Sequence, residues 1–392
     1  MHKHSRRQFL NAIGLAAGAN LSASRFARPS LWAAPPATSA TPRREIVDVS
    51  ALVKETQVKH QTPGMVGAIV DLKGIHSHGA SGLRKAGSAE PILAGDLIHL
   101  GSCTKALTAT LVGHLIDKKK LRFESTMRDV FPKLAPKMNA DMAKVTVTQL
   151  LSHTAGVPAD LDWWSFDRTG KPLTAQRLLV VQKVLTSAPE QPPGSKYVYS
   201  NTGYDLLGAI IEAKSRTSWE DYMTAQLFQP LGMKSAGFGP PGSKGKVDQP
   251  WGHLPKSGSL EAQQHDNPPV MGPAGRVHCT IDDWAKYIRF CLRMEKENSK
   301  ILSQATQKQL LTPAPNSDYS GGWIITERDW AGGRTLTHSG SNTLWYCTAW
   351  LAPLKGFAVL AATNLGGDDA ALACDELATA LIGKASNAKP AA

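Results

Sequence analysis

The chain has 392 residues, of which 42% are hydrophobic, and its formal net charge at pH 7 is +12. The positive charges are dispersed and form no basic stripe with interleaved aromatic residues, which argues against nucleic-acid binding. The five cysteines form no C-x-x-C pair and the twelve histidines no H-E-x-x-H motif. We therefore expect no disulfide framework, no metal and no other cofactor.

The first 34 residues are typical of an export signal. Ser5-Arg6-Arg7-Gln8-Phe9-Leu10 resembles a twin-arginine signal, and the weakly apolar run after it is too short to span a bilayer. We expect an exported protein, periplasmic or secreted, without a transmembrane segment in the mature chain. Removing residues 1–34 takes away five lysines and arginines, so the net charge of +12 becomes +7 over the remaining 358 residues.

Hydrophobic periodicity predicts a helix near 45–57, two strands of a hairpin at 65–72 and 75–81, and a turn followed by an amphipathic helix over 100–117. The next signals, up to about residue 300, are mostly helical: 145–151, 203–214, 218–228 and 280–294. Strand patterns return at 322–327, 334–338, 345–351 and 357–363, and a last helix is predicted at 369–382.

Strands at both ends of the chain and helices between them predict one α/β domain built from both termini, with a helical insertion. We assign residues 45–104 and 301–383 to the α/β domain and residues 105–300 to the inserted helical domain. The segment 384–392, rich in alanine and lysine, is expected to be a disordered tail.

Ser102 and Lys105 lie three residues apart where the helix at 100–117 is expected to begin, so their side chains share one side of the first turn. A serine hydroxyl needs a neighbouring base to act as a nucleophile, and the start of a helix offers unpaired N–H groups to an anion. The same S-x-x-K spacing occurs at 243–246 and 386–389, but neither copy heads an amphipathic helix. Cys103 is the rival nucleophile, and we interpret it as a small buried residue.

Two later stretches also carry polar groups suited to catalysis. Tyr199-Ser200-Asn201 is the only Tyr-x-Asn in the chain and precedes a predicted helix. His338-Ser339-Gly340 ends a short predicted strand, and a strand edge made of small residues can offer its backbone N–H groups to a substrate.

In this order, Ser102-Cys-Thr-Lys105, Tyr199-Ser-Asn201 and His338-Ser-Gly340 resemble the three motifs of class C β-lactamases and D-alanyl-D-alanine carboxypeptidases. These enzymes belong to a superfamily of penicillin-recognising serine hydrolases that also contains esterases and D-aminopeptidases. Residues 150–156 and 273–277 resemble two supporting segments. The resemblance covers about 45–383 and implies a β-lactamase/transpeptidase-like α/β fold, an antiparallel sheet flanked by terminal helices with a mostly helical inserted domain.

The resemblance also implies a role for each matching residue. Ser102 would be acylated, with Lys105 and Tyr199 as coupled proton carriers, and the N–H groups of Ser102 and Ser341, beside Gly340, would form the oxyanion hole. Lowering a tyrosine pKa from about 10 to about 7 takes roughly 4 kcal/mol. One ammonium about 4 Å away supplies roughly this energy at an effective dielectric constant near 20, so a single lysine suffices in principle to lower the Tyr199 pKa, and Lys105 and Tyr199 would titrate as a unit.

Asn201 would hold the substrate's amide or polarise Lys105, and His338 would face the carboxylate or leaving group of the substrate. The histidine stands where β-lactamases usually carry a lysine, which favours the carboxypeptidase and esterase branches. A histidine with an ordinary pKa is mostly neutral at pH 7, so we expect weak β-lactam hydrolysis. Trp163, Trp164 and Trp323 are candidates for the cleft wall, although buried core is the usual place of tryptophan.

The sequence thus predicts a serine acyl hydrolase for a small-molecule or peptide-like acyl substrate, and several alternatives stay open. The chain could instead be a penicillin-binding or sensing protein that is acylated with little turnover, although such a binder would not need Tyr199. An α/β-hydrolase would need G-x-S-x-G, which the chain lacks. The substrate could be a β-lactam, a D-Ala-D-Ala peptide, or a D-amino-acid amide or ester.

Overall fold

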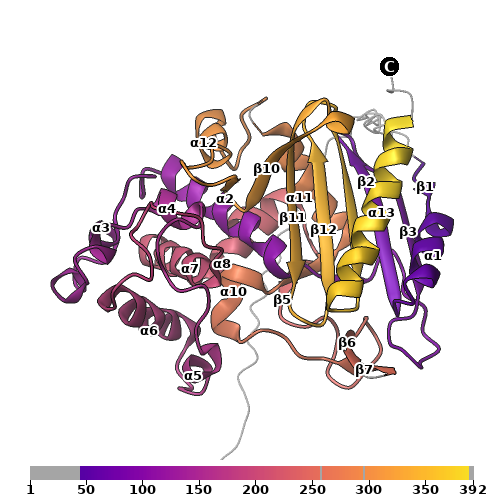
Figure 1. Cartoon of the computed structure of the whole chain (residues 1–392), viewed down its shortest axis with the longest axis horizontal. Helices are drawn as coiled ribbons and strands as arrows, with labels where there is room; N and C mark the ends of the chain where they lie inside the picture. Colours follow the sequence, from indigo (N-terminus) through magenta and orange to yellow (C-terminus); the bar gives the residue numbers. More distant parts are fainter. Residues whose placement is uncertain (1–44, 257, 295, 388–392) are drawn as a thin grey trace, which may run out of the picture. The chain divides into compact units, whose positions relative to one another are not determined.

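The computed structural model describes residues 45–256, 258–294 and 296–387 (Figure 1). Its centre is an eight-stranded sheet with the order β1-β3-β2-β13-β12-β11-β10-β9, in which only β1 and β3 pair in parallel. The strands are β1 (Val47–Asp48), β2 (Gly64–Asp71), β3 (Gly74–Gly82), β9 (Tyr319–Ser320), β10 (Trp323–Arg328), β11 (Gly333–Ser341), β12 (Tyr346–Ala352) and β13 (Phe357–Thr363).

Alternate residues of the central strands face two different helical layers. Met65 and Ile69 of β2 pack into a core with α1 (Ser50–Lys59) and α13 (Asp368–Asn387), and Figure 1 shows α13 lying along the sheet. Val66 and Val70 point to the opposite face, into the larger core. That face is covered by α11 (Ile281–Arg293) and continues into the helical part of the molecule.

The helical part surrounds α2 (Thr104–Asp117), which is buried from Thr104 through Leu115 on every side. The helix therefore has no solvent face, although the sequence pattern predicted a single apolar stripe. Its neighbours are α7 (Asn201–Ser215), α8 (Trp219–Met223), α10 (Gly272–Gly275) and α12 (Gln304–Leu310). The outer helices are α3 (Met127–Val130), α4 (Val147–Leu151), α5 (Trp163–Asp167), α6 (Leu173–Thr186) and α9 (Gln229–Leu231).

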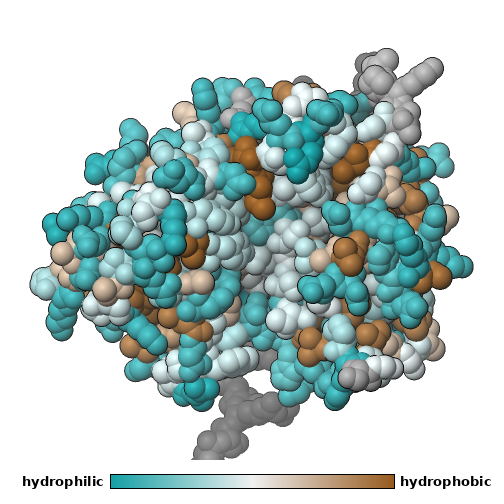
Figure 2. All heavy atoms as spheres, viewed as in Figure 1, coloured by the Kyte–Doolittle hydropathy of each residue, from teal (hydrophilic) through white to brown (hydrophobic). Residues whose placement is uncertain are grey.

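The described chain also contains short elements, among them the 3-10 turns η2 (Ala135–Lys137), η3 (Met142–Lys144), η5 (Pro269–Met271) and η6 (Asp329–Ala331). Three strands, β4 (Leu97–His99), β8 (Val277–Thr280) and β5 (Gly237–Phe238), form a small sheet, and β6 (Gly252–Lys256) pairs with β7 (Ser259–Gln263). A 3-10 turn, η1 (Gly101–Cys103), leads into α2, and a π-helical turn, η4 (Thr224–Phe228), extends α8. On the face shown in Figure 2, hydrophobic residues are scattered among hydrophilic ones.

The predicted fold class is confirmed, because a mostly antiparallel sheet lies between terminal helices and carries a helical region. The tail predicted from residue 384 is wrong for 384–387, which continue α13; Ala and Lys favour helix. Residues 388–392 and the proposed signal at 1–34 lie outside the described residues. The division at 105–300 stays a prediction, and α11 from that range packs on the sheet. In the described ranges, no helix has the length and apolarity to cross a membrane.

Candidate active site

Ser102 and Lys105 meet at the N-terminal end of α2. Ser102 lies in the 3-10 turn η1, two residues before α2 begins, and its side chain is half-buried. Lys105 is fully buried, and its Nζ lies 3.1 Å from Ser102 Oγ. The spacing that the sequence predicted therefore brings the amine to the hydroxyl.

The other two contacts of Lys105 Nζ are with oxygens that can only accept hydrogen bonds. They are Oδ1 of Asn201 at 2.7 Å and the backbone carbonyl of Ala274, at the end of α10, at 2.8 Å. Burial lowers the pKa of Lys105 to about 7, although the nearby Asp205 and Asp160 carboxyls oppose the shift. A neutral amine has two N–H donors and one lone pair, so the two carbonyls use the donors and the lone pair is left for the Ser102 hydroxyl.

Tyr199 lies just before α7, with its ring 4.8 Å from Lys105 Nζ. The fall in its pKa that one lysine could in principle cause does not occur. Burial raises the pKa of Tyr199 well above its ordinary value, and a hydrogen bond with Ser102 opposes this only in part. Desolvation penalises the phenolate, and Lys105, whose own pKa is lowered, carries a full positive charge only below neutral pH. Tyr199 therefore keeps its proton at working pH.

Asn201 is the first residue of α7, and both ends of its amide are engaged. Its Oδ1 accepts from Lys105, and its Nδ2 donates to Asp160 Oδ1 and Oδ2 at 3.0 and 3.2 Å. Ser200 caps the helix by accepting from the Gly203 N–H, and donates to the carbonyl of Pro158 at 2.6 Å. Of the two roles that the resemblance implied for Asn201, this geometry favours the contact with Lys105.

His338 lies on β11 and is buried, with both ring nitrogens occupied. Nδ1 lies 2.6 Å from the carbonyl of Ser339, which can only accept, and Nε2 lies 3.0 Å from the hydroxyl of Tyr319. A neutral imidazole with its proton on Nδ1 satisfies both contacts. A carboxylate of the substrate would reach Nε2 only by displacing Tyr319, so the direct contact implied by the resemblance stays a prediction.

The two segments expected to form the oxyanion hole lie against each other. Gly101 has φ +46°, and a Cβ built on it would lie 2.4 Å from the backbone nitrogen of Ser341. On the opposite side of this contact, a Cβ on Gly340 would lie 2.0 Å from the carbonyl oxygen of Leu100. The two glycines thus allow η1 and β11 to approach closely, so that the backbones of Ser102 and Ser341 lie near each other. That their N–H groups bind an oxyanion stays a prediction.

His153 supports Tyr199, a role that the sequence analysis did not assign. Its ring lies 4.5 Å from the ring of Tyr199 and 4.4 Å from that of Tyr319, measured between centroids. Its Nδ1 accepts the backbone N–H of Ser200 at 3.1 Å, and burial holds its pKa well below the ordinary value. The sequence signal for this residue was its place in the supporting segment 150–156. In the structure, the backbone of His153 has a φ of +57°, which is uncommon for a non-glycine residue.

A second unassigned residue, Asp266, is a buried carboxylate behind the site. It accepts hydrogen bonds from Asn342 Nδ2 at 2.9 Å and from Arg276 Nε at 3.2 Å. Asn342 follows Ser341 and uses its Oδ1 to accept the backbone N–H groups of Leu344 and Trp345. Burial alone would raise the pKa of Asp266, but the hydrogen bond from His99, the positive charge of Arg276 and the hydrogen bond from Asn342 hold it below its usual value.

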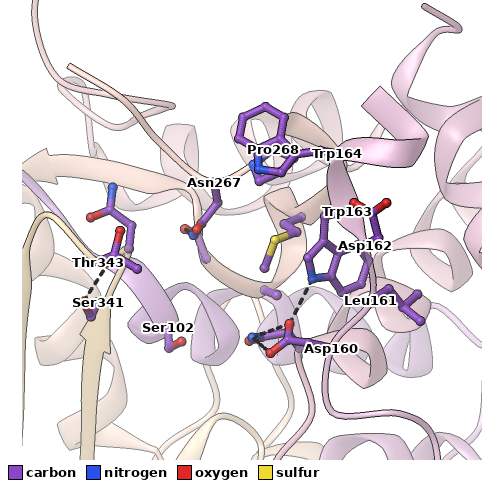
Figure 3. A pocket seen from close by; sticks show the side chains of 15 residues that line it. Ser102, Asp160, Leu161, Asp162, Trp163, Trp164, Asn267, Pro268, Ser341 and Thr343 are labelled. Carbon is purple, nitrogen blue, oxygen red and sulfur yellow. Dashed lines mark hydrogen bonds between the residues drawn. The ribbon is translucent and has the colours of Figure 1, made fainter. Parts of the chain in front are cut away.

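Two pockets open on either side of Ser102. One has a volume of about 380 Å³ and is lined by Asp160, Trp163, Trp164 and Ser341 among others. Figure 3 shows Ser102 between Ser341 on one side and Asp160 on the other, with both tryptophans on the Asp160 side. The second pocket, of about 490 Å³, is lined by Tyr199, Arg328 and His338 among others. Trp163 and Trp164 therefore line a cleft.

The remaining candidates that the structure describes are not among the residues that line these pockets. Trp323 is a buried core residue, and Ser243 sits in an exposed loop, its backbone N–H donating to Asp248. Cys103 is buried with its sulfur 3.7 Å from that of Cys347, as expected for a small core residue. Lys389 lies outside the described residues. Within the described part of the chain, no group of three or more His, Cys, Asp or Glu side chains is arranged to hold a metal ion.

The chain is similar in sequence to curated proteins. Penicillin-binding protein 4 of Amycolatopsis lactamdurans is 27% identical over 338 residues, which cover 79% of this chain and 83% of that protein. Protein flp of Staphylococcus aureus (strain MW2) is 26% identical over 292 residues, 72% of this chain but only 56% of flp.

The chain also shares its fold with solved structures. The octameric penicillin-binding protein homologue from Pyrococcus abyssi superposes with a TM-score of 0.69 and 24% identity, covering 84% of this chain and 75% of that one. A D-stereospecific amidohydrolase from Streptomyces sp. gives a TM-score of 0.66 with 19% identity, covering 84% of this chain and 98% of that one.

The Beta-lactamase family matches residues 49–383, which is most of the chain and includes all three motifs. The fold and the relatives agree with this match. The chain belongs to the beta-lactamase family of serine hydrolases, as the three motifs predicted.

Proposed function

We propose that this protein is an exported serine acyl hydrolase that cleaves an amide or ester through an acyl-enzyme on Ser102. The observation that carries the proposal is the buried amine of Lys105, 3.1 Å from Ser102 Oγ, with a pKa lowered to about 7. A base whose pKa lies near the working pH is the most effective general base. A protein that binds acyl compounds without reacting with them has no need of such a base, whereas a sensor that is acylated needs it, so turnover is what distinguishes a hydrolase from a sensor.

In the first half of the reaction, neutral Lys105 takes the proton of the Ser102 hydroxyl while Oγ attacks the carbonyl carbon. The carbonyl π electrons move to oxygen, and the backbone N–H groups of Ser102 and Ser341 stabilise the oxyanion. The bond to the leaving nitrogen or oxygen then breaks as that atom takes a proton from Tyr199. Tyr199 recovers its proton from the Lys105 ammonium, which leaves an acyl-serine and restores both proton carriers. Water repeats these steps in the second half, and the products are the free acid and the free enzyme.

Tyr199 also indicates which pocket takes which half of the substrate. A proton donor must face the leaving group, and Tyr199 lines the pocket that contains His338 and Arg328. The leaving group would therefore occupy that pocket, and the acyl half would occupy the pocket of Asp160 on the other side of Ser102.

The test is to incubate the purified protein with β-lactams, D-Ala-D-Ala peptides and short acyl esters, following turnover and intact mass. We expect many turnovers on an ester or amide, weak β-lactam hydrolysis, and a trapped acyl group on the peptide containing Ser102. Ser102→Ala should abolish both turnover and the trapped acyl group, and Cys103→Ala should keep both. One acyl group per chain followed by no turnover would identify a sensor instead, and an adduct on Cys103 or Ser243 would contradict the assignment of the nucleophile.

Export is proposed from the sequence alone, on the arginine pair in Ser5-Arg6-Arg7-Gln8-Phe9-Leu10. The full chain, expressed in a bacterium with the twin-arginine pathway, should appear outside the cytoplasm. Replacing Arg6 and Arg7 by lysine should keep it inside. Equal export of both chains would contradict a twin-arginine signal.

A further inference from the structure

The pocket that would take the acyl half is acidic. Its lining includes two carboxylates, Asp160 and Asp162, and no lysine, arginine or histidine among the described residues that line it. Asp162 is already occupied, because Arg168 lies 3.4 Å from its Oδ2 and its Oδ1 caps α5. Asp160 is the carboxylate that remains to interact with a bound molecule.

The carboxylate of Asp160 is held in place by neutral donors. Trp163 Nε1 donates to Oδ1 at 2.9 Å, and Asn201 Nδ2 contacts both oxygens. Across the described parts of the chain, no lysine, arginine or histidine nitrogen lies within salt-bridge distance of it. A carboxylate has about four acceptor positions, so the oriented group keeps acceptor capacity toward the exposed side of the pocket.

The walls around this carboxylate are apolar and aromatic. Leu161, Trp163, Trp164 and Met271 line the same pocket as Asp160. Trp164 is 49% exposed although it is a large hydrophobic residue, and Figure 3 shows it on the Asp160 side of the cavity. A cation is favoured over an aromatic face as well as beside a carboxylate, so both features select the same kind of ligand.

We propose that Asp160 binds an ammonium group on the acyl half of the substrate, so that the enzyme prefers aminoacyl donors with a free amine and an apolar side chain. The proposal rests on the proposed function and narrows its substrate class. Asp160 is exposed, so solvent screens the charge pair and its effect is moderate. Asp160 also contacts Asn201, a partner of Lys105, so the test must separate binding of the ammonium from positioning of Asn201.

The experiment compares leucine p-nitroanilide, in both enantiomers, with its N-acetyl derivative, which has the same leaving group but no ammonium. At pH 7 a free α-amine is mostly protonated. We expect the wild type to prefer the free amine in one enantiomer. Asp160→Asn, which keeps an oxygen acceptor for Asn201, should lower kcat/KM about 10-fold for the free amine and less than 2-fold for the N-acetyl compound.

Asp162→Asn is the matched control, because Asp162 lines the same pocket but is paired with Arg168. It should leave the ratio of the two kcat/KM values unchanged. The preference of the wild type should also weaken as salt is raised. An equal loss on both substrates in Asp160→Asn would assign Asp160 to positioning Asn201 and overturn the proposal, as would an unchanged ratio or a wild-type preference for the N-acetyl compound. If neither anilide is cleaved, the proposal fails, whereas acylation of Ser102 by a short ester would still support the proposed function.

Discussion

Oδ2 of Asp266 accepts a hydrogen bond at 3.0 Å from Nε2 of His99, a fully buried residue of β4. The other nitrogen of this ring, Nδ1, accepts the backbone N–H of Gly101 at 3.1 Å, immediately before Ser102. Since Asp266 also holds Asn342, next to Ser341, one carboxylate connects both backbone segments of the proposed oxyanion hole.

Asp266→Asn should therefore impair catalysis more than binding. The amide presents N–H groups where the network needs acceptors, so η1 and β11 shift relative to each other. We expect kcat to fall about 10- to 100-fold, with a smaller change in KM; this is less than the roughly 10²- to 10³-fold cost of losing an oxyanion donor outright, because Asp266 only positions the donors. Asp248→Asn, on an exposed loop, is the control and should leave both constants unchanged. Equal kcat values for the wild type and Asp266→Asn would show that Asp266 does not position the oxyanion hole.

The carboxylate of Asp266 should also make the free energy of unfolding depend on pH. Its pKa is lowered in the folded protein, so its stabilising contribution is complete above the ordinary carboxyl pKa near 4 and is lost as the pH falls through the lowered value. Urea unfolding at pH 7 should show Asp266→Asn less stable than the wild type by about 3 kcal/mol, the usual cost of removing one partner from a buried charged network. The difference should narrow below pH 4, and a difference that grows in acid would contradict the sign of the shift.

Lys105 predicts the pH dependence of the reaction. The lysine must be neutral to accept the Ser102 proton, and its pKa is lowered to about 7. For a neutral ester, kcat/KM should therefore rise with pH, with a midpoint near 7, and level off above pH 8. Lys105→Arg should be nearly as inactive as Lys105→Ala, because arginine keeps its proton throughout this range. A flat profile between pH 5.5 and 8.5, or an active arginine variant, would mean that Lys105 supplies only charge.

Local spacing made Ser102 and Lys105 predictable, because three residues at a helix start fix the relation of two side chains. Tyr199, Asn201 and His338 could be placed only by the resemblance, since no local pattern brings residues from three distant segments together. The strands at 65–72, 345–351 and 357–363 were also recognisable, because their apolar residues carry the β pattern.

Other parts of the site depend on tertiary contacts that spacing does not encode. Ala274 contributes a backbone carbonyl, which any residue type could supply, and Asp160 and Asp266 lie in loops without a motif. The Tyr199 pKa does not fall as the charge of Lys105 alone predicted, because burial of the phenol outweighs that charge. Burial raises the Tyr199 pKa and lowers that of Lys105. It therefore favours the neutral form of both groups, which weakens the charge–charge attraction between a phenolate and an ammonium.

Tyr199→Phe should distinguish substrates by their leaving groups. Tyr199 keeps its proton, since burial raises its pKa, and it can protonate a departing amine. Amide hydrolysis should slow about 10²- to 10⁴-fold, the usual contribution of a positioned acid or base. Hydrolysis of a p-nitrophenyl ester, whose leaving group departs as an anion, should lose much less in the acylation step. Pre-steady-state kinetics would separate acylation from deacylation, and equal losses in acylation for both substrates would argue against Tyr199 as the acid.

Gly340→Ala tests the close approach of β11 to η1. The added Cβ would lie 2.0 Å from the carbonyl oxygen of Leu100 and 2.9 Å from the backbone nitrogen of Cys103, and backbone atoms cannot rotate away as a side chain can. We expect a loss of about 2 kcal/mol or more in the free energy of unfolding, as for other overpacked sites. Activity should also fall in the fraction that remains folded, because Ser341 would move away from Ser102.

Gly383→Ala is the control, since its Cβ would meet nothing within 4 Å in α13. This variant should be neutral or stabilising by up to about 1 kcal/mol. A Gly340→Ala protein with the stability and activity of the wild type would show that the backbones of Ser102 and Ser341 need not lie this close for catalysis.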